Sequence, residues 1–217
     1  MLVCVLSSFT GHAQTPSYFF WEPEFSIGFE SSEKWSHTFG IADRALLSGY
    51  QDGEQIAEFQ NEHLELNHFT QYKTGANTSV SLGLRYRFKE LFEESSYDEL
   101  RFVEQFKVSH PNSDLGLGHR IRVEQRFKNI ITEHRFRYQF GGSKDLNEEF
   151  ALGLSTEALL TLANQVKPSL EQRFLLEITN STFENLELSI GLDYEMADYN
   201  NALEHEFFLL TGVALEL

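Results

Sequence analysis

Apolar and polar residues alternate along much of this chain, and many of the polar positions are arginine. The clearest stretch is 120–127, where Ile121, Val123 and Phe127 occupy one set of alternate positions. The other set holds Arg120, Arg122, Glu124 and Arg126. A β-strand places successive side chains on opposite faces, so this spacing predicts a strand with one apolar and one charged face. Which of the two faces lies inside the fold decides the class of protein.

Eleven segments show this alternation or a related apolar pattern, and turn-forming residues separate them. They are Tyr18–Phe29, Lys34–Leu47, Glu58–Tyr72, Thr78–Phe88, Glu99–Ser109, Leu115–Phe127, Ile131–Phe140, Phe150–Thr161, Ser169–Thr179, Leu186–Met196 and His205–Leu217. Many run about 11–13 residues, whereas strands of globular proteins average about five or six. Long, evenly spaced strands are typical of a barrel tilted across a bilayer. The sequence therefore predicts an all-β, antiparallel up-and-down transmembrane β-barrel.

The expected number of strands rests on a general rule for bacterial barrels and not on the number of segments found. Single-chain bacterial barrels almost always contain an even number of strands. We therefore expect ten or twelve strands, with one of the eleven segments divided wrongly or one strand missed. Glu104 is an exception within its apolar face, because Phe102 and Phe106 flank it. A charge at the bilayer midplane is costly, so we expect Glu104 to lie near a rim, follow a bulge or form a pair.

The composition excludes several other classes of protein. The chain has 17 Lys+Arg against 33 Asp+Glu, a formal charge of −16, which argues against a nucleic-acid partner. No apolar run reaches the roughly 18 residues of a spanning helix, which excludes helical membrane proteins only. Cys4 is the single cysteine, so neither an intrachain disulfide nor a cysteine-based metal site is possible. No other spacing is diagnostic, and we expect no metal, cofactor or catalytic residue.

The first residues have the features of an export signal. Met1–Leu6 is apolar, and Gly11 and Ala13 are small residues at a cleavage-site spacing. We expect residues 1–13 to be a cleaved signal peptide and residues 14–217 to form a single barrel domain in the outer membrane. The alternative is a buried N-terminal strand. The expected partners are outer-membrane lipid and, during biogenesis, the barrel assembly machinery.

Two stretches carry a resemblance to a known family. Gly118–Phe127 reads GHRIRVEQRF, and His134–Phe140 reads HRFRYQF. Together with Ser81–Phe88 and the pair Glu104-Gln105, they resemble the bacterial domain-of-unknown-function 2490 family. Its members are regarded as outer-membrane β-barrels of Gram-negative bacteria. The resemblance covers the whole mature chain and implies the same fold and location here. The family has no assigned activity, so the resemblance implies no catalytic residues.

The charged face is the candidate functional site. By parity it should hold a lumen charge network of Arg85, Arg87, Arg101, Arg120, Arg122, Glu124, Arg126, Glu133, Arg135, Arg137, Glu171 and Arg173. Two interpretations remain open. The network closes the lumen with ion pairs, because buried guanidinium and carboxylate groups must pair. Alternatively, its arginines line a narrow pore that admits a small solute or anion.

Two further functions must be weighed against these. A soluble exported lipocalin-like ligand carrier would turn its apolar faces inward and its arginines to water. An outer-membrane hydrolase would need catalytic groups at one place, and the candidates are His63, His68, His205, Ser79 and Ser81. His63 and His68 are separated by five residues and therefore fall on opposite strand faces, which argues against a shared metal.

Overall fold

The computed structural model describes residues 15–51, 53–57, 59–89, 98–111, 113 and 115–217. The expected signal peptide, residues 1–13, lies outside the described residues. The described part consists of strands, turns and loops, and no helix in it is long and apolar enough to cross a membrane. The strands are β1 (Ser17–Glu30), β2 (Trp35–Gln51), β3 (Glu54–Ala57), β4 (Gln60–Gly75), β5 (Thr78–Lys89), β6 (Glu99–His110), β7 (Leu117–Lys128), β8 (Ile131–Asp145), β9 (Phe150–Ala163), β10 (Val166–Phe183), β11 (Leu186–Ala197) and β12 (Glu204–Glu216).

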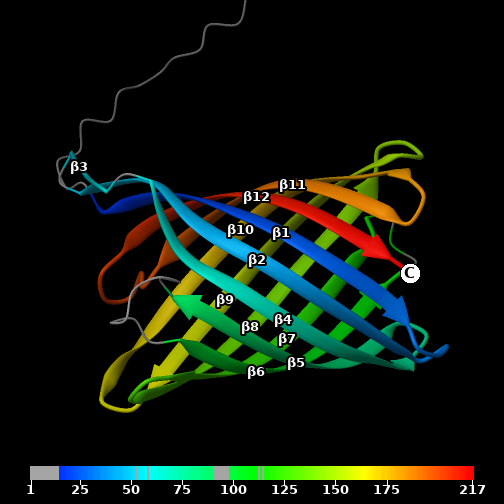
Figure 1. The fold of residues 1–217 in the computed structure, drawn as a ribbon, viewed down its shortest axis with the longest axis horizontal. Coiled ribbons are helices and arrows are strands. Elements are labelled where there is room, and N and C mark those ends of the chain that lie inside the picture. Colours follow the sequence, from blue (N-terminus) through cyan, green and yellow to red (C-terminus); the bar gives the residue numbers. More distant parts are fainter. Residues whose placement is uncertain (1–14, 52, 58, 90–97, 112, 114) are drawn as a thin grey trace, which may run out of the picture.

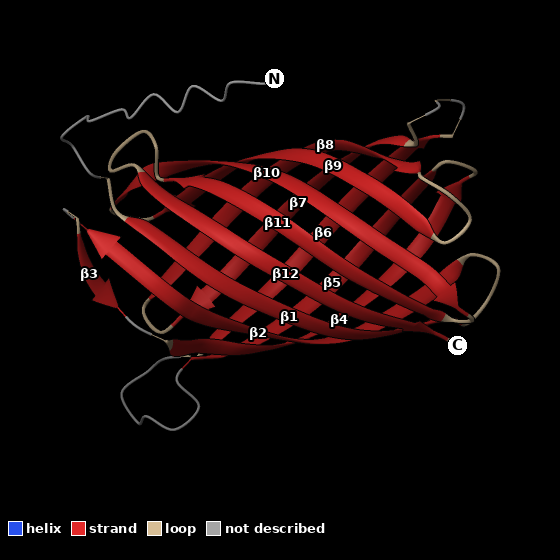
Figure 2. Ribbon diagram, turned by 90° about the horizontal axis from the view of Figure 1, so that it is seen from above, coloured by secondary structure: helices blue, strands red, loops and turns tan. Residues whose placement is uncertain are grey.

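The strands form a closed barrel, and the prediction of an all-β up-and-down barrel is confirmed. Apart from the short β3, each strand pairs with the strands before and after it in the wall, and the wall strands tilt in the same sense around the cylinder (Figures 1 and 2). Every one of the eleven predicted segments corresponds to a strand of the wall. The alternation was enough to find them because each strand separates two environments along its whole length.

The strand count differs in one respect from the expected ten or twelve. The sheet contains twelve strands, but β3 pairs only with the end of β2, so eleven strands close the wall. In a meander the strand direction reverses at each turn, so the first and eleventh wall strands run the same way. The closing pair, β1 with β12, is accordingly parallel, while the other pairs are antiparallel. An even-numbered, fully antiparallel wall is therefore wrong for this chain.

An odd wall places its two ends at opposite mouths of the cylinder. Strand β1 begins at Ser17 at one mouth, here called the N-terminal rim, and β12 ends at Glu216 at the other, the C-terminal rim (Figure 1). The turns β1–β2, β4–β5, β6–β7, β8–β9 and β10–β11 lie at the C-terminal rim, because β1 runs toward it.

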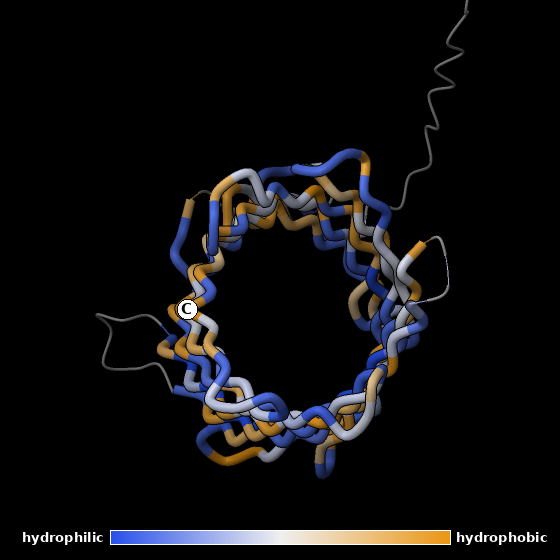
Figure 3. Tube along the Cα trace, turned by 90° about the vertical axis from the view of Figure 1, so that its right-hand side faces the viewer, coloured by the Kyte–Doolittle hydropathy of each residue, from blue (hydrophilic) through white to orange (hydrophobic). Residues whose placement is uncertain are grey.

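The apolar side chains face outward, and the charged ones face into the barrel. Figure 3, which looks along the barrel, shows the backbone as a ring with hydrophobic and hydrophilic residues alternating. Leu82 is 68% exposed and Ile190 is 52% exposed, whereas Glu99 and Glu124 are completely buried. This distribution is the reverse of a water-soluble protein, in which large apolar side chains are buried and charges are exposed.

Glu104 does not fit any of the three expected positions. It faces outward near the middle of β6, opposite Leu82 on β5 and Val123 on β7. The register of β6 with both neighbours is regular, and Glu104 forms no ion pair or hydrogen bond within the described chain. The regular hydrogen-bond ladder fixes the face to which each residue of β6 points, and Glu104 falls on the outer face.

Candidate functional site

The twelve charged residues picked out by parity all lie on the inner face of the barrel. They come from five strands, β5, β6, β7, β8 and β10. The ladder register places Arg85 opposite Arg101, Arg101 opposite Arg126, and Arg122 opposite Arg137. Like charges directly opposite each other are destabilising, so these arginines need carboxylates between them. We call these twelve residues and the acidic partners described next the charged belt.

Glu99 is the acidic centre of the belt on the β6–β7 side. Its carboxylate accepts two hydrogen bonds from Arg126, Nε to Oε1 at 2.8 Å and Nη2 to Oε2 at 3.0 Å, and also pairs with Arg101. Arg126 in turn lies 3.1 Å from Glu133. Such two-point pairing of guanidinium with carboxylate is strong and geometrically specific. Glu99 thus holds two arginines of adjacent strands in fixed positions.

Glu157 on β9 connects strands that are not neighbours. It accepts a hydrogen bond from Arg120 Nη2 at 2.7 Å and one from Arg137 Nε at 2.6 Å. Arg120 lies on β7 and Arg137 on β8, so the carboxylate bridges three strands. Arg137 Nη1 also donates to Glu124 Oε1 at 2.9 Å. The belt therefore joins strands that are not direct neighbours in the wall, in addition to following the ladders.

The remaining predicted arginines pair with acids on β4, β10 and β11. Arg85 and Arg87 both pair with Glu65 on β4, at 3.1 and 2.9 Å. The other acidic partners are Glu171 for Arg135, and Asp193 and Glu195 for Arg173. Five acidic members of the belt are absent from the predicted network: Glu65, Glu99, Glu157, Asp193 and Glu195. The same parity marks them as inward, but their pairing depends on register, which alternation does not fix.

An apolar cluster fills the lumen on the side away from most of the arginines. Phe20, Leu46 and Phe208 are buried together, with the rings of Phe20 and Phe208 stacked at a centroid distance of 5.0 Å. The guanidinium of Arg44 lies 4.8 Å from the Phe208 ring centroid, and that of Arg173 lies 5.6 Å from it. These cation–π contacts join the apolar cluster to the charged belt.

The half of the lumen nearer the C-terminal rim is hollow. One cavity of about 380 Å³ extends from Arg85 and Arg122 to the rim residues Glu30 and Glu216. A second cavity, of about 520 Å³, extends from Arg120 to Gly116 and Ser143. Lys107 lines both. We call these two cavities the chamber.

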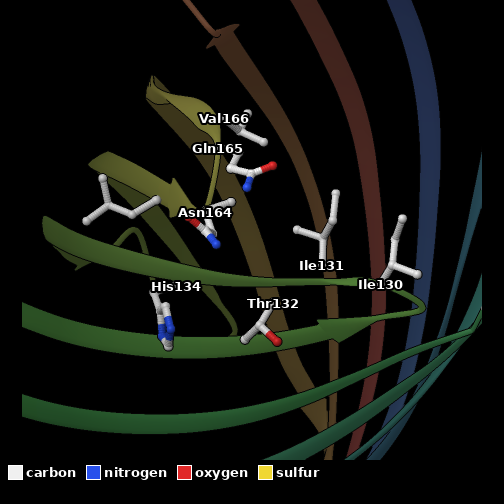
Figure 4. Close-up of a pocket in the computed structure, with 9 residues that line it drawn as sticks. Ile130, Ile131, Thr132, His134, Asn164, Gln165 and Val166 are labelled. Atoms are coloured by element: carbon white, nitrogen blue, oxygen red, sulfur yellow. The ribbon is translucent and has the colours of Figure 1, made fainter.

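A separate groove lies at the N-terminal rim, at the turns β7–β8 and β9–β10. Its volume is about 810 Å³, and Figure 4 shows its lining residues, including Ile130, Ile131, His134 and Val166. His134 is paired with Leu162 in the ladder and has the outward parity of β8. The groove is therefore part of the outer, mostly apolar rim and is not connected with the charged belt.

The residues considered for a hydrolase do not form one site. His63 faces inward and is buried, whereas His68 and His205 face outward, His68 against Phe39 and His205 against Tyr194. Ser81 faces inward on β5. In the described part of the chain, no group of three or more His, Cys, Asp or Glu residues is arranged to hold a metal ion.

Comparison with known proteins identifies a family but no activity. No curated protein matches the chain significantly. Among solved structures, OmpT (in-vitro folded), an outer membrane protein of Vibrio cholerae, aligns over 84% of this chain and 87% of that chain. The identity is 7% and the TM-score 0.41. The family model described as "Protein of unknown function (DUF2490)" matches residues 23–205. The chain thus belongs to the DUF2490 family.

Proposed function

We propose that this protein is an outer-membrane β-barrel with a structural role in the envelope, and that its lumen is closed by the charged belt and the apolar cluster. The observation that carries the proposal is the direction of the side chains: large apolar groups outside, arginine and glutamate inside. Only a non-polar surrounding makes that arrangement favourable. The wall strands of 12–18 residues exceed the roughly 9–11 residues needed to cross a bilayer.

The burial of inward side chains supports a closed lumen. Val103, Leu159 and Phe208 all face inward and are 1–2% exposed, and Glu99 and Glu124 are 0% exposed. They come from β6, β7, β9 and β12, which lie on different sides of the cylinder. In a water-filled pore, these side chains would be exposed to solvent. Permanent anion conduction, the other interpretation of the arginine-rich face, therefore has less support than closure.

The two remaining functions have little support. A lipocalin-like carrier requires apolar side chains inside, and here Leu82, Ile190 and Leu192 are outside and more than half exposed. A hydrolase requires nucleophile and base within hydrogen-bonding reach. Among the described residues, His63 is the inward-facing member of the histidines considered, and neither Ser79 nor Ser81 has a hydrogen bond to it.

The location can be tested by fractionation combined with one outward substitution. We expect the protein to remain with membranes after alkaline carbonate extraction and to be released by detergent. Ile190→Arg should destabilise the inserted barrel by about 2–4 kcal/mol, because Ile190 lies near the middle of β11 on the outer face. On a water-facing surface the same change costs less than about 0.5 kcal/mol.

A matched control is Leu186→Arg, because Leu186 shares the outward parity but is the first residue of β11. Near the membrane interface an arginine costs only about 0–1 kcal/mol. Recovery of the protein in the periplasmic fraction, or equal tolerance of both arginines, would refute the membrane assignment. For the closed lumen, we expect no steady current when the purified protein is inserted into a planar bilayer.

A further inference from the structure

Three positive side chains lie next to one another where the charged belt meets the chamber. Lys107 on β6 is directly opposite Arg120 on β7, and Gln105 is directly opposite Arg122. Because β6 and β7 place residues two apart on the same face, Lys107, Arg120 and Arg122 are contiguous on the inner surface. Direct opposition of like charges is unfavourable unless a negative group lies nearby.

Lys107 has no such partner from the protein. Within the described residues it forms no ion pair and no hydrogen bond. It lines both cavities of the chamber. Arg120 differs, because it is neutralised by Glu157 at 2.7 Å. The amine of Lys107 thus faces open space beside two guanidiniums.

Arg122 is buried but incompletely neutralised. It is 7% exposed, and its two shortest hydrogen bonds, at 3.1 and 2.7 Å, go from Nε and Nη2 to the neutral Oε1 of Gln105. The nearest carboxylate is Glu124, with Oε1 at 3.6 Å from Nη1. That oxygen already accepts a hydrogen bond from Arg137 at 2.9 Å. A buried charge needs close compensation, and the protein supplies little of it here.

The guanidinium of Arg122 is nevertheless held in a defined position at the cavity. The ring of Phe69 lies 5.9 Å from it and 5.2 Å from the guanidinium of Arg85, with both distances measured to the ring centroid. Gly83 makes room for this ring, because a Cβ at that position would overlap Phe69. Both arginines also line the 380 Å³ cavity. The cations are therefore positioned around one space before any ligand enters.

We propose that the chamber contains a binding site for a multiply charged oxyanion, such as the phosphate or polycarboxylate group of a small solute, with Lys107 and Arg122 as its main ligands. The guanidinium supplies directional hydrogen bonds and the ammonium supplies a compact charge. Asn67, Gln71 and Ser81 line the same cavity and provide neutral donors. The cavity reaches Glu30 and Glu216 at the C-terminal rim, which gives a solute a route in. This site requires only the folded barrel and goes beyond the structural role.

The site can be tested with inorganic phosphate and citrate as probes on the purified full-length barrel. Titration calorimetry in chloride buffer at constant ionic strength should detect saturable binding of one probe or both. Lys107→Gln should raise the Kd at least about tenfold, because it removes a charge-assisted interaction. Lys73→Gln is the matched control, since Lys73 lines the same cavity but is paired with Glu30 at 2.7 Å. It should change the Kd less than about twofold.

Chemical protection gives a second readout that does not depend on a variant folding. Acetylation of the wild-type barrel, followed by mass spectrometry, should show Lys107 protected by the probe that binds, with Lys144 unaffected. Lys144 lies near the end of β8 and does not line the cavity. Absence of saturable binding for both probes, or equal weakening by the Lys107 and Lys73 changes, would overturn the proposal. Either result would leave the membrane assignment intact.

Discussion

The two halves of the lumen share one backbone cylinder but differ in what fills it. Toward the N-terminal rim, the charged belt and the apolar cluster of Phe20, Leu46 and Phe208 leave side chains fully buried. Toward the C-terminal rim, many of the inward residues are small, and they surround the chamber. Examples are Ser26, Ser36, Gly118, Gly141, Gly153 and Ser155. A barrel of this width is therefore closed or hollow according to side-chain size and charge, not strand number alone.

The largest difference between the halves should appear on removal of an acid from the belt. Glu99→Gln leaves Arg101 and Arg126 buried without their shared carboxylate, so we expect a loss of about 3–5 kcal/mol in the free energy of unfolding. Urea titration of the barrel in detergent micelles measures it. Glu30→Gln at the chamber rim removes an ion pair whose side chains are 61% and 46% exposed, and should cost less than about 1 kcal/mol. Equal costs would contradict the contrast between belt and chamber.

Opening the closed half should change permeability as well as stability. Phe208→Ala removes a ring that is 1% exposed and contacts Phe20, and it should cost about 3 kcal/mol or more. We also expect a small steady current in planar bilayers, where the wild-type barrel gives none. Phe207→Ala is the control, because Phe207 faces outward on the same strand. A current from Phe207→Ala, or none from Phe208→Ala, would show that the apolar cluster does not close the lumen.

One inward glycine, Gly83, lies where the charged belt meets the chamber. Gly83→Ala places a methyl group where the ring of Phe69 lies, so the ring must shift. We expect a loss of about 1–3 kcal/mol, measured in the same urea titration. The change should also weaken any binding of phosphate or citrate, because Phe69 positions Arg85 and Arg122.

The smallest effect should come from the corresponding change inside the chamber. At Gly153 a Cβ would meet its nearest atoms at 3.8 and 3.9 Å, which is ordinary contact. Gly153→Ala should therefore leave the fold unchanged and raise the free energy of unfolding by about 0.4–1 kcal/mol, through lower entropy of the unfolded chain. A marked loss of stability would mean that the chamber is packed more tightly than its volume indicates.

Much of the wall could be predicted from the sequence, because the outer and inner faces of the barrel impose opposite requirements on alternate residues. All eleven wall strands and the inward side of Arg122 and Arg137 followed from parity. The partners did not: Glu157 contacts Arg120 across an intervening strand, and only the register of β7, β8 and β9 brings them together. The parallel closure was missed because it contradicts the even count of related barrels. β3 was missed because four residues are too few for a pattern.

Because β1 and β12 pair in parallel, the wall starts on one side of the molecule and finishes on the other. An epitope joined before Ser17 and another joined after Glu216 would lie at opposite mouths of the cylinder, which in the proposed outer-membrane barrel means opposite sides of the bilayer. Protease or antibody added to intact cells should reach one of them and spare its counterpart.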